Sequence, residues 1–580
     1  MAAQPGGRVK SPDPACRALA ARGWRPCRRL AFIPAVFLVL AGASHRPVGS
    51  DPSLPAVGRS DPNDVVRFLE QATFGPTPEL ARHVQSIGIE RYLDDQFALR
   101  GSFYPVLPQM PADTTAGCPD GSLSTCLRDN YTMYPLQVRF FQNALGQDDQ
   151  VRQRVAFVLH EILVVSGVKE REPSQVAPYL NLLLEDAFGN YRQLLEHLTL
   201  NPAMGHYLDM VNNDAPTATG SAAPNENYAR EILQLFSIGL DTLNQDGTPQ
   251  RDASGTPIPT YTQATITQFA KVFTGWTYAS YPGVAGQKHN PANFLAPMWL
   301  YRNAAGVDSS HDKTPKSLLA YPGAVHQALP ANRDGAVDLS DALDNVFDHP
   351  NVGPFIGKQL IQHLVTSNPS PAYVSRVAAA FANDGSGTRG NLRAVVRAIL
   401  LDPEARGASK GDAAYGRLRE PVLFVTNLCR ALDATSDGIL GSTATALGQN
   451  LFNSPTVFGY YPHAYGIPGT PFQGPEFGIQ TNVAAQARAN LVNTLAFSQI
   501  RSAAPDFGTS LDLRGLQSLA ADPARLVAEL NWLLMHGSMS DPMKATVTDA
   551  VSAVPATNPL LRAQTALYLV ATSSQYQVAR

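Results

Sequence analysis

The sequence predicts a mainly α fold: a large multi-helical globular protein with long ordered loops and at most a short β-hairpin. Apolar residues recur at helical spacing in one segment after another, whereas the period-two alternation of strands is rare. Hydrophobic residues make up 44% of the 580 residues. This content is enough for a substantial core and is too high for a disordered chain.

The first predicted helix begins at Asp61. Val65, Val66 and Leu69 keep one apolar face, and Gly75 followed by proline ends the pattern. The other helical patterns cover residues 77–87, 88–97, 133–145, 149–165, 174–186, 191–200, 225–240, 263–273, 338–347, 352–365, 373–382, 391–401, 420–432, 482–497, 523–534 and 558–572.

Strand signals are confined to residues 246–261, where two turn dipeptides, Asp-Gly and Ser-Gly, allow one short hairpin. Two long segments, 278–330 and 450–480, lack helical periodicity and are rich in Pro, Gly and aromatic residues. Loops of this length in a compact chain are functional or disordered. Their aromatic content favours ordered loops.

The N-terminus has the pattern of a signal peptide. Arg17, Arg22, Arg25, Arg28 and Arg29 precede an apolar run over residues 30–41, and small residues at 41–43 fit a cleavage site. We expect residues 1–43 to be the signal peptide and 44–60 a linker, with 61–580 forming one large helical domain or two lobes split near residue 335. The protein is thus expected to be exported to the periplasm or the extracellular space, by general secretion or by the twin-arginine route.

Three cysteines remain after such a cleavage. Cys118 and Cys126 flank a short polar segment that export would expose to oxidising conditions, so a local disulfide is expected. Cys429 lies in an apolar helical pattern and is expected to be a buried small hydrophobe.

The charge pattern excludes some partners. The formal net charge is −3, charged residues are 16% of the chain, and no basic stripe marks a nucleic-acid interface. No segment after the N-terminal region is long and apolar enough to cross a membrane as a helix.

Residues 224–240, PNENYAREILQLFSIGL, are the most informative stretch and are predicted to form one amphipathic helix. At 100° per residue its polar side chains fall in an arc of about 140°. Asn225 can cap the start, and Gly239 fits a left-handed stop. The polar face is either an ordinary solvated surface with a Glu226–Arg230 pair or the lining of a functional cluster.

A second candidate cluster lies in the first long loop. His311 can act as a base or metal ligand, Asp312 can orient it, and Lys316 can bind an anion. The alternative is a polar loop with a local ion pair. In the second loop, residues 460–463 (YYPH) fit either a strip that stacks on carbohydrate or aromatic groups, or simple loop packing.

Two other motifs lack the neighbouring residues or elements that their function requires. His160-Glu161 begins like the zinc signature H-E-x-x-H, but Val164 replaces the second histidine. The glycines at 385–390 have the spacing of a dinucleotide fingerprint, but a helix precedes them instead of a strand.

Eight segments in this order identify the chain as resembling the exported bacterial family called domain of unknown function 1800, from about Asp61 to the C-terminus. The segments are FLEQATFGPTPEL, AFGNYRQLLEHLTLNPAMGHYLD, PNENYAREILQLFSIGL, YTQATITQFAKVFTGW, RGNLRAVVRAILLDPEAR, REPVLFVTNLCRAL, PTVFGYYPHAYGIPGT and LYLVATSSQYQV. Members of the family often occur beside a sulfatase-like exported family, so the resemblance implies such a protein as a partner.

The resemblance also marks polar positions that match the family pattern. These positions are Asn225, Glu226, Asn227, Arg230, Glu231, Tyr261, His311, Asp312 and Lys316. Relatives carry a small polar residue where this chain has His160, which we therefore leave out of any shared site.

Two functions follow as expectations. In the first, the protein is an extracytoplasmic enzyme, hydrolase-like and acting on a polymer. Glu226, Glu231, His311 and Asp312 then supply acid/base chemistry or ligate a divalent metal, while Asn225, Asn227, Arg230, Tyr261 and Lys316 bind the substrate. In the second, it is a non-catalytic binding or assembly protein, and the same residues form a buried structural network.

Overall fold

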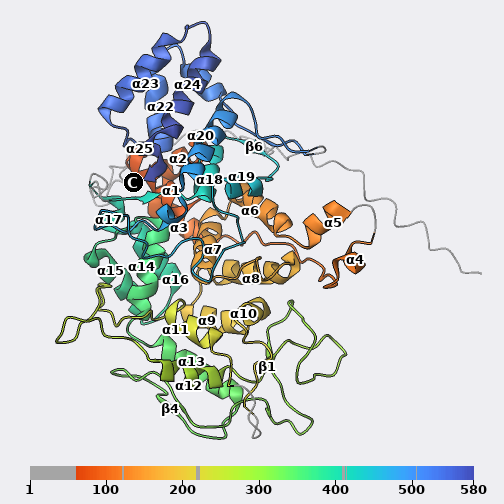
Figure 1. The fold of residues 1–580 in the computed structure, drawn as a ribbon. Helices are drawn as coiled ribbons and strands as arrows, with labels where there is room; N and C mark the ends of the chain where they lie inside the picture. The colour runs from red at the N-terminus through yellow and green to blue at the C-terminus, as the bar shows by residue number, and fades with distance from the viewer. Residues whose placement is uncertain (1–59, 120–122, 217–222, 408–411, 413–414, 504–505) are drawn as a thin grey trace, which may run out of the picture. The chain divides into compact units, whose positions relative to one another are not determined.

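The computed structural model describes residues 60–580 except 120–122, 217–222, 408–411, 413–414 and 504–505 (Figure 1). The expected signal peptide and nearly all of the expected linker lie outside the described residues. The structure is 51% helical, and its described residues form 25 helices and only short antiparallel strand pairs, which confirms the mainly α class.

The elements follow one another along the chain. They are α1 (Pro62–Ala72), α2 (Pro78–Ile87), α3 (Ile89–Ala98), α4 (Thr114–Gly117), α5 (Leu123–Asn130), α6 (Tyr134–Gly146), α7 (Gln150–Ile162), α8 (Pro173–Asp186), α9 (Tyr191–Leu200), α10 (Pro202–Tyr207), α11 (Asn227–Gln234), α12 (Gln263–Val272), β1 (Trp276–Thr277), β2 (Trp299–Leu300), β3 (Lys316–Ser317), β4 (Ala328–Leu329), α13 (Gly335–Phe347), α14 (Val352–Leu364), α15 (Pro371–Ala382), α16 (Leu392–Leu401), α17 (Pro403–Arg406), β5 (Arg417–Leu418), α18 (Pro421–Ala431), β6 (Thr435–Ser436), α19 (Gly441–Ala446), the 3-10 helix η3 (Pro475–Ile479), α20 (Asn482–Phe497), β7 (Thr509–Ser510), α21 (Arg514–Leu519), α22 (Pro523–Met535), α23 (Asp541–Ala553), α24 (Pro559–Thr572), α25 (Ser574–Gln577) and β8 (Val578–Ala579).

Local sequence explains where these helices begin and end. At α2 the Thr77 hydroxyl accepts a hydrogen bond from the Leu80 amide at 3.0 Å, Pro78 occupies the first turn, and Gly88 ends the helix at φ +87°. Glycine accepts this left-handed backbone without the steric cost that a Cβ would bring.

The predicted helix over 225–240 is shorter in the structure. Residues 227–234 form α11, after which the amides of Leu235 and Phe236 both donate to the Glu231 carbonyl, so the regular ladder is lost. Irregular turns continue to Gly239, whose φ of +73° matches the predicted left-handed stop. The Asn225 side chain accepts from the Asn227 amide at 2.9 Å, close to its predicted capping role.

The predicted hairpin over 246–261 forms only isolated bridges, such as Leu243 with Pro249 and Arg251 with Pro257. Prolines in the segment lack the amide that a strand ladder requires. In the described residues the strands are four antiparallel two-residue pairs: β1–β2, β3–β4, β5–β8 and β6–β7.

Helix α7 lies at the centre of the core. It packs against α1, α3, α6, α8 and α14 and is buried on nearly all sides. Buried aliphatic residues such as Val158 and Leu159 each contribute about 1.5–3 kcal/mol by leaving water. Such all-round burial brings polar groups inside as well, including Glu161.

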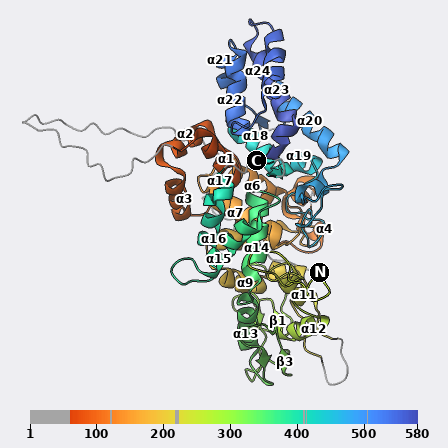
Figure 2. The ribbon, with the colours of Figure 1, turned by 90° about the vertical axis from the view of Figure 1, so that its left-hand side faces the viewer.

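Other helices pack around this core (Figure 2). Helices α14, α15 and α16 pack together, and α20, α22, α23 and α24 form a separate helical layer. Strand β8 pairs with β5, which fixes the end of the chain against residues 417–418.

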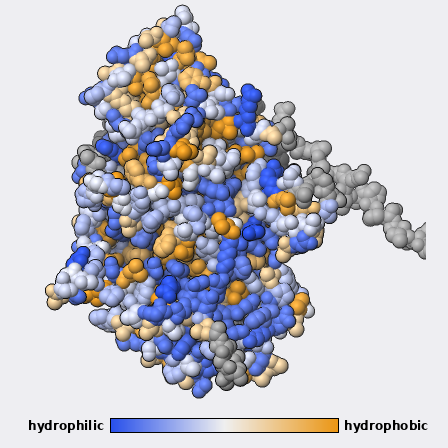
Figure 3. All heavy atoms as spheres, in the orientation of Figure 1, coloured by the Kyte–Doolittle hydropathy of each residue, from blue (hydrophilic) through white to orange (hydrophobic). Residues whose placement is uncertain are grey.

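Cys118 and Cys126 form a disulfide with a Cα–Cα distance of 5.8 Å, as their spacing predicts. Cys429 is buried and unpaired, and burial raises the pKa of its thiol to about 12. None of the helices in the described residues combines the length and apolar character that a membrane span requires. On the face shown in Figure 3, apolar residues are scattered among polar ones.

Candidate functional site

The first turn of α11 holds Glu226 in a polar network. Its Oε2 accepts from Arg230 Nη2 at 3.3 Å and from Gln263 Nε2 at 2.7 Å, and its Oε1 accepts from the Thr267 hydroxyl at 2.8 Å. The side chains of Glu226 and Arg230 are 30% and 38% exposed. Glu226 is therefore a paired and half-buried carboxylate that fixes α11 against α12.

Glu231, one turn later, lies in a different environment. Its Oε2 is buried and has no hydrogen-bond partner, and the same holds for the hydroxyl of Tyr261. Burial raises the pKa of Glu231, which the Arg230 guanidinium offsets only in part. Burial and the nearby Glu231 raise the pKa of Tyr261 to about 12. Unpartnered buried polar atoms are costly, so they are typical of positions that meet a ligand or an ordered water.

A histidine–carboxylate pair completes this region. His206 Nδ1 lies 2.7 Å from Glu170 Oε1, with Glu170 fully buried and the His206 side chain 43% exposed. A carboxylate at Nδ1 fixes the ring and leaves Nε2 as the basic nitrogen. The second oxygen of Glu170, like that of Glu231, is buried without a partner.

Tyr207 lies in the electrostatic field of both carboxyl groups. Burial, together with the charges of Glu170 and Glu231, raises its pKa to about 12. We call Glu170, His206, Tyr207, Glu231 and Tyr261 the Glu170–Glu231 site.

Surrounding polar contacts hold the site together. Asp209 accepts from Lys169 Nζ and from Asn227 Nδ2, both at 2.7 Å, and thereby joins the segment before α8 to α11. Asp209 and Asn212 have left-handed φ values of +57° and +60°. Such backbone conformations at non-glycine residues are costly and cluster at functional sites.

The predicted contact between α11 and the His311 loop is not formed. Gln263, Thr267 and Lys271 follow one stripe of α12: the first two contact Glu226, whereas Lys271 Nζ donates to Thr314 Oγ1 at 3.2 Å. Glu226 and the His311 loop therefore contact neighbouring turns of α12, about 5 Å apart along the helix axis. Within the described residues no hydrogen bond or ion pair joins them directly.

His311 and Lys316 instead converge on Asp338. Its Oδ2 lies 3.2 Å from His311 Nε2 and 2.8 Å from Lys316 Nζ, and Arg333 Nε lies 3.2 Å from Oδ1. Burial alone would raise the pKa of Asp338, but the hydrogen bonds from His311 and Lys316 hold it below its ordinary value. Asp312 is also buried and closes a local turn by accepting from the Thr314 amide at 2.8 Å. This loop is a buried ion-pair network, in which Asp338 Oδ1 contacts Arg333 but accepts no hydrogen bond.

A second carboxylate cluster lies in the core, and the sequence pattern did not reveal it. Gln449 Nε2 donates to Glu161 Oε1 at 3.1 Å and to Glu420 Oε2 at 2.8 Å. Arg417 pairs with Glu420 at 3.0 Å and with Glu476 at 2.9 Å. All of these side chains are buried.

The two carboxyl groups that Gln449 bridges have pKa values shifted in opposite directions. Burial and the Glu420 carboxylate raise the pKa of Glu161 well above its ordinary value. Burial would raise the pKa of Glu420 too, but Arg417 and a hydrogen bond from Glu161 lower it to about 2. His363 Nδ1 lies 3.1 Å from Glu161 Oε2 without hydrogen-bond geometry, and burial lowers the pKa of His363 to about 3.

This Glu161–Glu420 cluster is closed to substrates. The Tyr461 hydroxyl donates to Glu420 at 3.0 Å and is buried, as is Tyr460. The two tyrosines therefore pack inside the fold instead of forming a stacking strip. A cavity beside His160 has a volume of only about 10 Å³, too small for a substrate. The cluster joins α7, α18 and the 450–480 loop.

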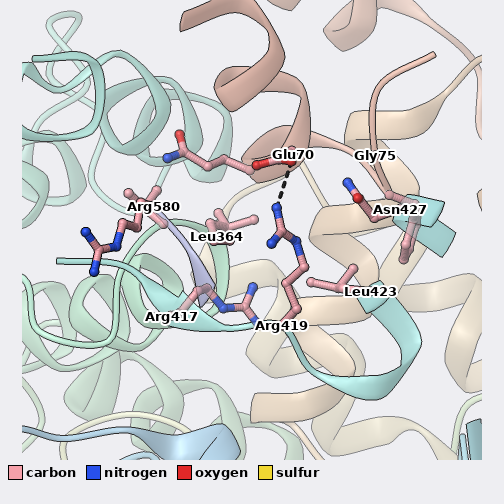
Figure 4. Close-up of a pocket in the computed structure, with 12 residues that line it drawn as sticks. Glu70, Gly75, Leu364, Arg417, Arg419, Leu423, Asn427 and Arg580 are labelled. Carbon is pink, nitrogen blue, oxygen red and sulfur yellow. Dashed lines mark hydrogen bonds and ion pairs between the residues drawn. The ribbon is translucent and has the colours of Figure 1, made fainter. Parts of the chain in front are cut away.

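A further polar cavity lies next to this cluster (Figure 4). Glu70 Oε1 pairs with Arg419 Nη2 at 2.8 Å, and its Oε2 lies 3.0 Å from His536 Nδ1. The volume of the cavity, about 20 Å³, accommodates one water molecule. A cavity of this size is too small for a substrate.

One group of three potential metal ligands occurs among the described residues: His326, Asp341 and Asp344. Asp341 already pairs with Arg333, and Asp344 with Arg192 at 2.6 Å. Two guanidinium groups thus neutralise the carboxylates that a cation would need, and the donor set fits a divalent metal poorly.

The site therefore combines predicted and unpredicted residues. Glu231, Tyr261, Arg230 and Asn227 were candidates from the sequence. Glu170 was not, because it lies in a loop without a periodic pattern. His206 and Tyr207 lie inside the segment NPAMGHYLD, so the motif itself was the available signal.

The family can now be stated. A family model described as "Protein of unknown function (DUF1800)" matches residues 67–578. No curated protein and no solved structure matches the chain. Because the family model covers most of its length, the chain belongs to the DUF1800 family.

Proposed function

We propose that this protein is an extracytoplasmic enzyme that hydrolyses a substrate carried on a polymer. The reaction proceeds by general acid–base catalysis at the Glu170–Glu231 site. The observations that support the proposal are a half-exposed histidine fixed by a buried carboxylate and a second carboxyl group, Glu231, that acts with Glu170 on the pKa of Tyr207 and has a raised pKa itself. A carboxyl group with a raised pKa suits the role of a general acid.

The roles follow from the environment of each group. His206 removes a proton from a water molecule, whose oxygen forms a bond to the electrophilic atom of the substrate. As the bond to the leaving atom breaks, Glu231 donates its proton to that atom. Proton exchange with solvent returns the proton from His206 to Glu231. Glu170 positions the His206 ring through its 2.7 Å contact with Nδ1.

The raised pKa of Glu231 supports the acid role, since a carboxyl group must be protonated to act as an acid near neutral pH. Arg230 and Lys169 lie beside the site and supply positive charge for an anionic substrate group. The expected export of the chain places this activity outside the cytoplasm. A divalent metal is not needed for these steps.

The alternative is a non-catalytic binding or assembly protein that works with a sulfatase-like exported partner. The networks at Glu226 and Asp338 favour it, because every carboxylate there is paired. The Glu170–Glu231 site favours the enzyme, because two of its carboxyl oxygens have no partner.

Hydrolysis of a panel of esters, glycosides and peptides distinguishes the two functions. We expect the wild-type protein to hydrolyse at least one class, and Glu231→Gln and His206→Asn each to lower the rate by roughly 10²–10⁴-fold, the usual contribution of a general acid or base.

The matched control is His326→Asn, which removes another histidine that lies beside an aspartate and is similarly exposed, at 41%. Asparagine also accepts the left-handed backbone of His326 at φ +52°. If no class is hydrolysed faster by the wild type than by Glu231→Gln, the enzyme proposal is wrong and the assembly function gains support.

A further inference from the structure

We infer that the groove between α8, α9, α10 and the 294–297 segment binds the aliphatic acyl chain of the substrate, which makes the substrate an acyl ester or amide. This inference rests on the function proposed above and adds the chemical class of the substrate.

The groove has the size and lining of a ligand site. Its volume is about 510 Å³, within the range of about 300–1,000 Å³ that small-molecule sites occupy. Most of its lining is apolar and includes Val106, Pro178, Leu182, Leu200 and Leu295. Val106 and Leu295 are 80% and 54% exposed, so the apolar surface is open to solvent.

Two connections link the groove to the Glu170–Glu231 site. Phe294 lines the groove, and its ring centroid lies 6.1 Å from that of His206, in an edge-on arrangement. Helix α10 begins at Pro202 in the groove and ends at Tyr207 in the site, a rise of about 8 Å.

Close packing at α10 holds the 294–298 segment against the helices. The Met298 amide donates to the Leu200 carbonyl at 2.7 Å, which holds the 294–298 segment on the helices. A Cβ at Gly205 would lie 2.4 Å from the Met298 sulfur, so the Met298 side chain would have to move if residue 205 carried a side chain. The Phe294 ring is therefore the contact between the groove and His206.

The lining favours an aliphatic chain over a sugar or an aromatic ring. Four polar residues also line the groove, but Asn181, His197 and Asn201 already bond to Tyr104, Asp186 and the start of α10, so the surface offered to a ligand is mainly aliphatic. The one aromatic residue of the lining, Phe294, is only 3% exposed and offers little face for stacking.

The reaction on such a substrate balances without a further reactant. The water oxygen bonds to the acyl carbon while His206 takes its proton, the bond from that carbon to the leaving oxygen or nitrogen breaks, and Glu231 protonates the leaving atom. The products are a carboxylic acid and an alcohol or amine.

Binding of 1-decanoylglycerol, a neutral acyl ester, tests the groove. The titration uses the His206→Asn protein, in which hydrolysis is suppressed, and calorimetry measures the affinity. We expect 1-decanoylglycerol to bind at one site and 1-acetylglycerol, which has the same head group, not to bind measurably.

Added to His206→Asn, Leu295→Asp should weaken binding about 10- to 100-fold, because the lost apolar contact contributes about 1.5–3 kcal/mol. The control is Val483→Asp in the same background, at an exposed apolar residue of α20 whose exposure is 74%; it should bind like His206→Asn alone.

The outcomes separate the two proposals. If Leu295→Asp weakens the binding of 1-decanoylglycerol but the wild type does not hydrolyse it, the result supports the groove as a binding site and refutes the proposed enzyme activity. If both esters are hydrolysed at equal rates and Leu295→Asp leaves binding unchanged, the groove inference is wrong and the proposed enzyme activity is supported. No measurable binding of 1-decanoylglycerol also overturns the groove inference.

Discussion

Replacing Arg417 with methionine tests whether the Glu161–Glu420 cluster stabilises the fold. Arg417 is 4% exposed and pairs with both Glu420 and Glu476. Methionine keeps much of the apolar stem but removes the charge, so two buried carboxylates lose their shared partner. Removing one member of a buried ion pair costs about 3–5 kcal/mol in the free energy of unfolding.

The cost should depend on pH. The pKa of Glu420 is held near 2 chiefly by Arg417, so its loss raises this pKa toward and above the ordinary value. Protonation then relieves the uncompensated charge at acidic pH. We therefore expect a larger loss of stability at pH 7 than at pH 5.

Reversible urea unfolding, followed by far-UV circular dichroism, measures the change. Arg514→Met is the matched control, since Arg514 is 87% exposed and pairs with Asp512 at 2.5 Å. An exposed pair contributes about 0–1 kcal/mol. If Arg417→Met destabilises the protein no more than Arg514→Met does, the cluster does not stabilise the fold.

Four other predictions follow from the structure and the sequence. Because folding raises the pKa of Glu161, the free energy of unfolding of the wild type falls as pH rises from about 4.5 through the folded-state pKa of Glu161. Glu161→Gln should abolish this fall, and an unchanged pH profile of unfolding would contradict the raised pKa of Glu161. Replacing both Cys118 and Cys126 with serine should cost up to about 2–3 kcal/mol for a loop of this length, measured as a lowered unfolding midpoint. The exported protein should begin near Ser44, and N-terminal sequencing that finds the apolar run over 30–41 retained would contradict this. Elemental analysis of protein purified without chelators should find no stoichiometric divalent metal, since the one three-ligand group among the described residues is already neutralised by arginines.

Sequence periodicity predicted most of the long helices because their apolar faces are well separated from their polar ones. Helix α23 was missed: only Val547 and Val551 of its thirteen residues are buried, so it lacks a continuous apolar stripe. The short helix α10 was missed because six residues are too few to show a period. The strand pairs are two residues long and carry no pattern at all.

The candidate site was only half predictable for a related reason. Glu231 and Tyr261 were candidates from the sequence because they belong to motifs. Glu170 and His206 are 36 residues apart in the sequence, so their contact depends on tertiary packing. Similarly, Glu161 lies on a helix whose sequence does not show that all its sides are buried.

The central claim is that His206 and Glu231 act together on one substrate. A double-mutant cycle on the compound that the wild type hydrolyses fastest tests it most directly, using His206→Asn, Glu231→Gln and both together. Residues that act as a unit give strongly non-additive losses. We predict that the double variant is about as slow as the slower single variant. Losses that multiply, or single variants that hydrolyse the compound at the wild-type rate, would contradict the proposed site.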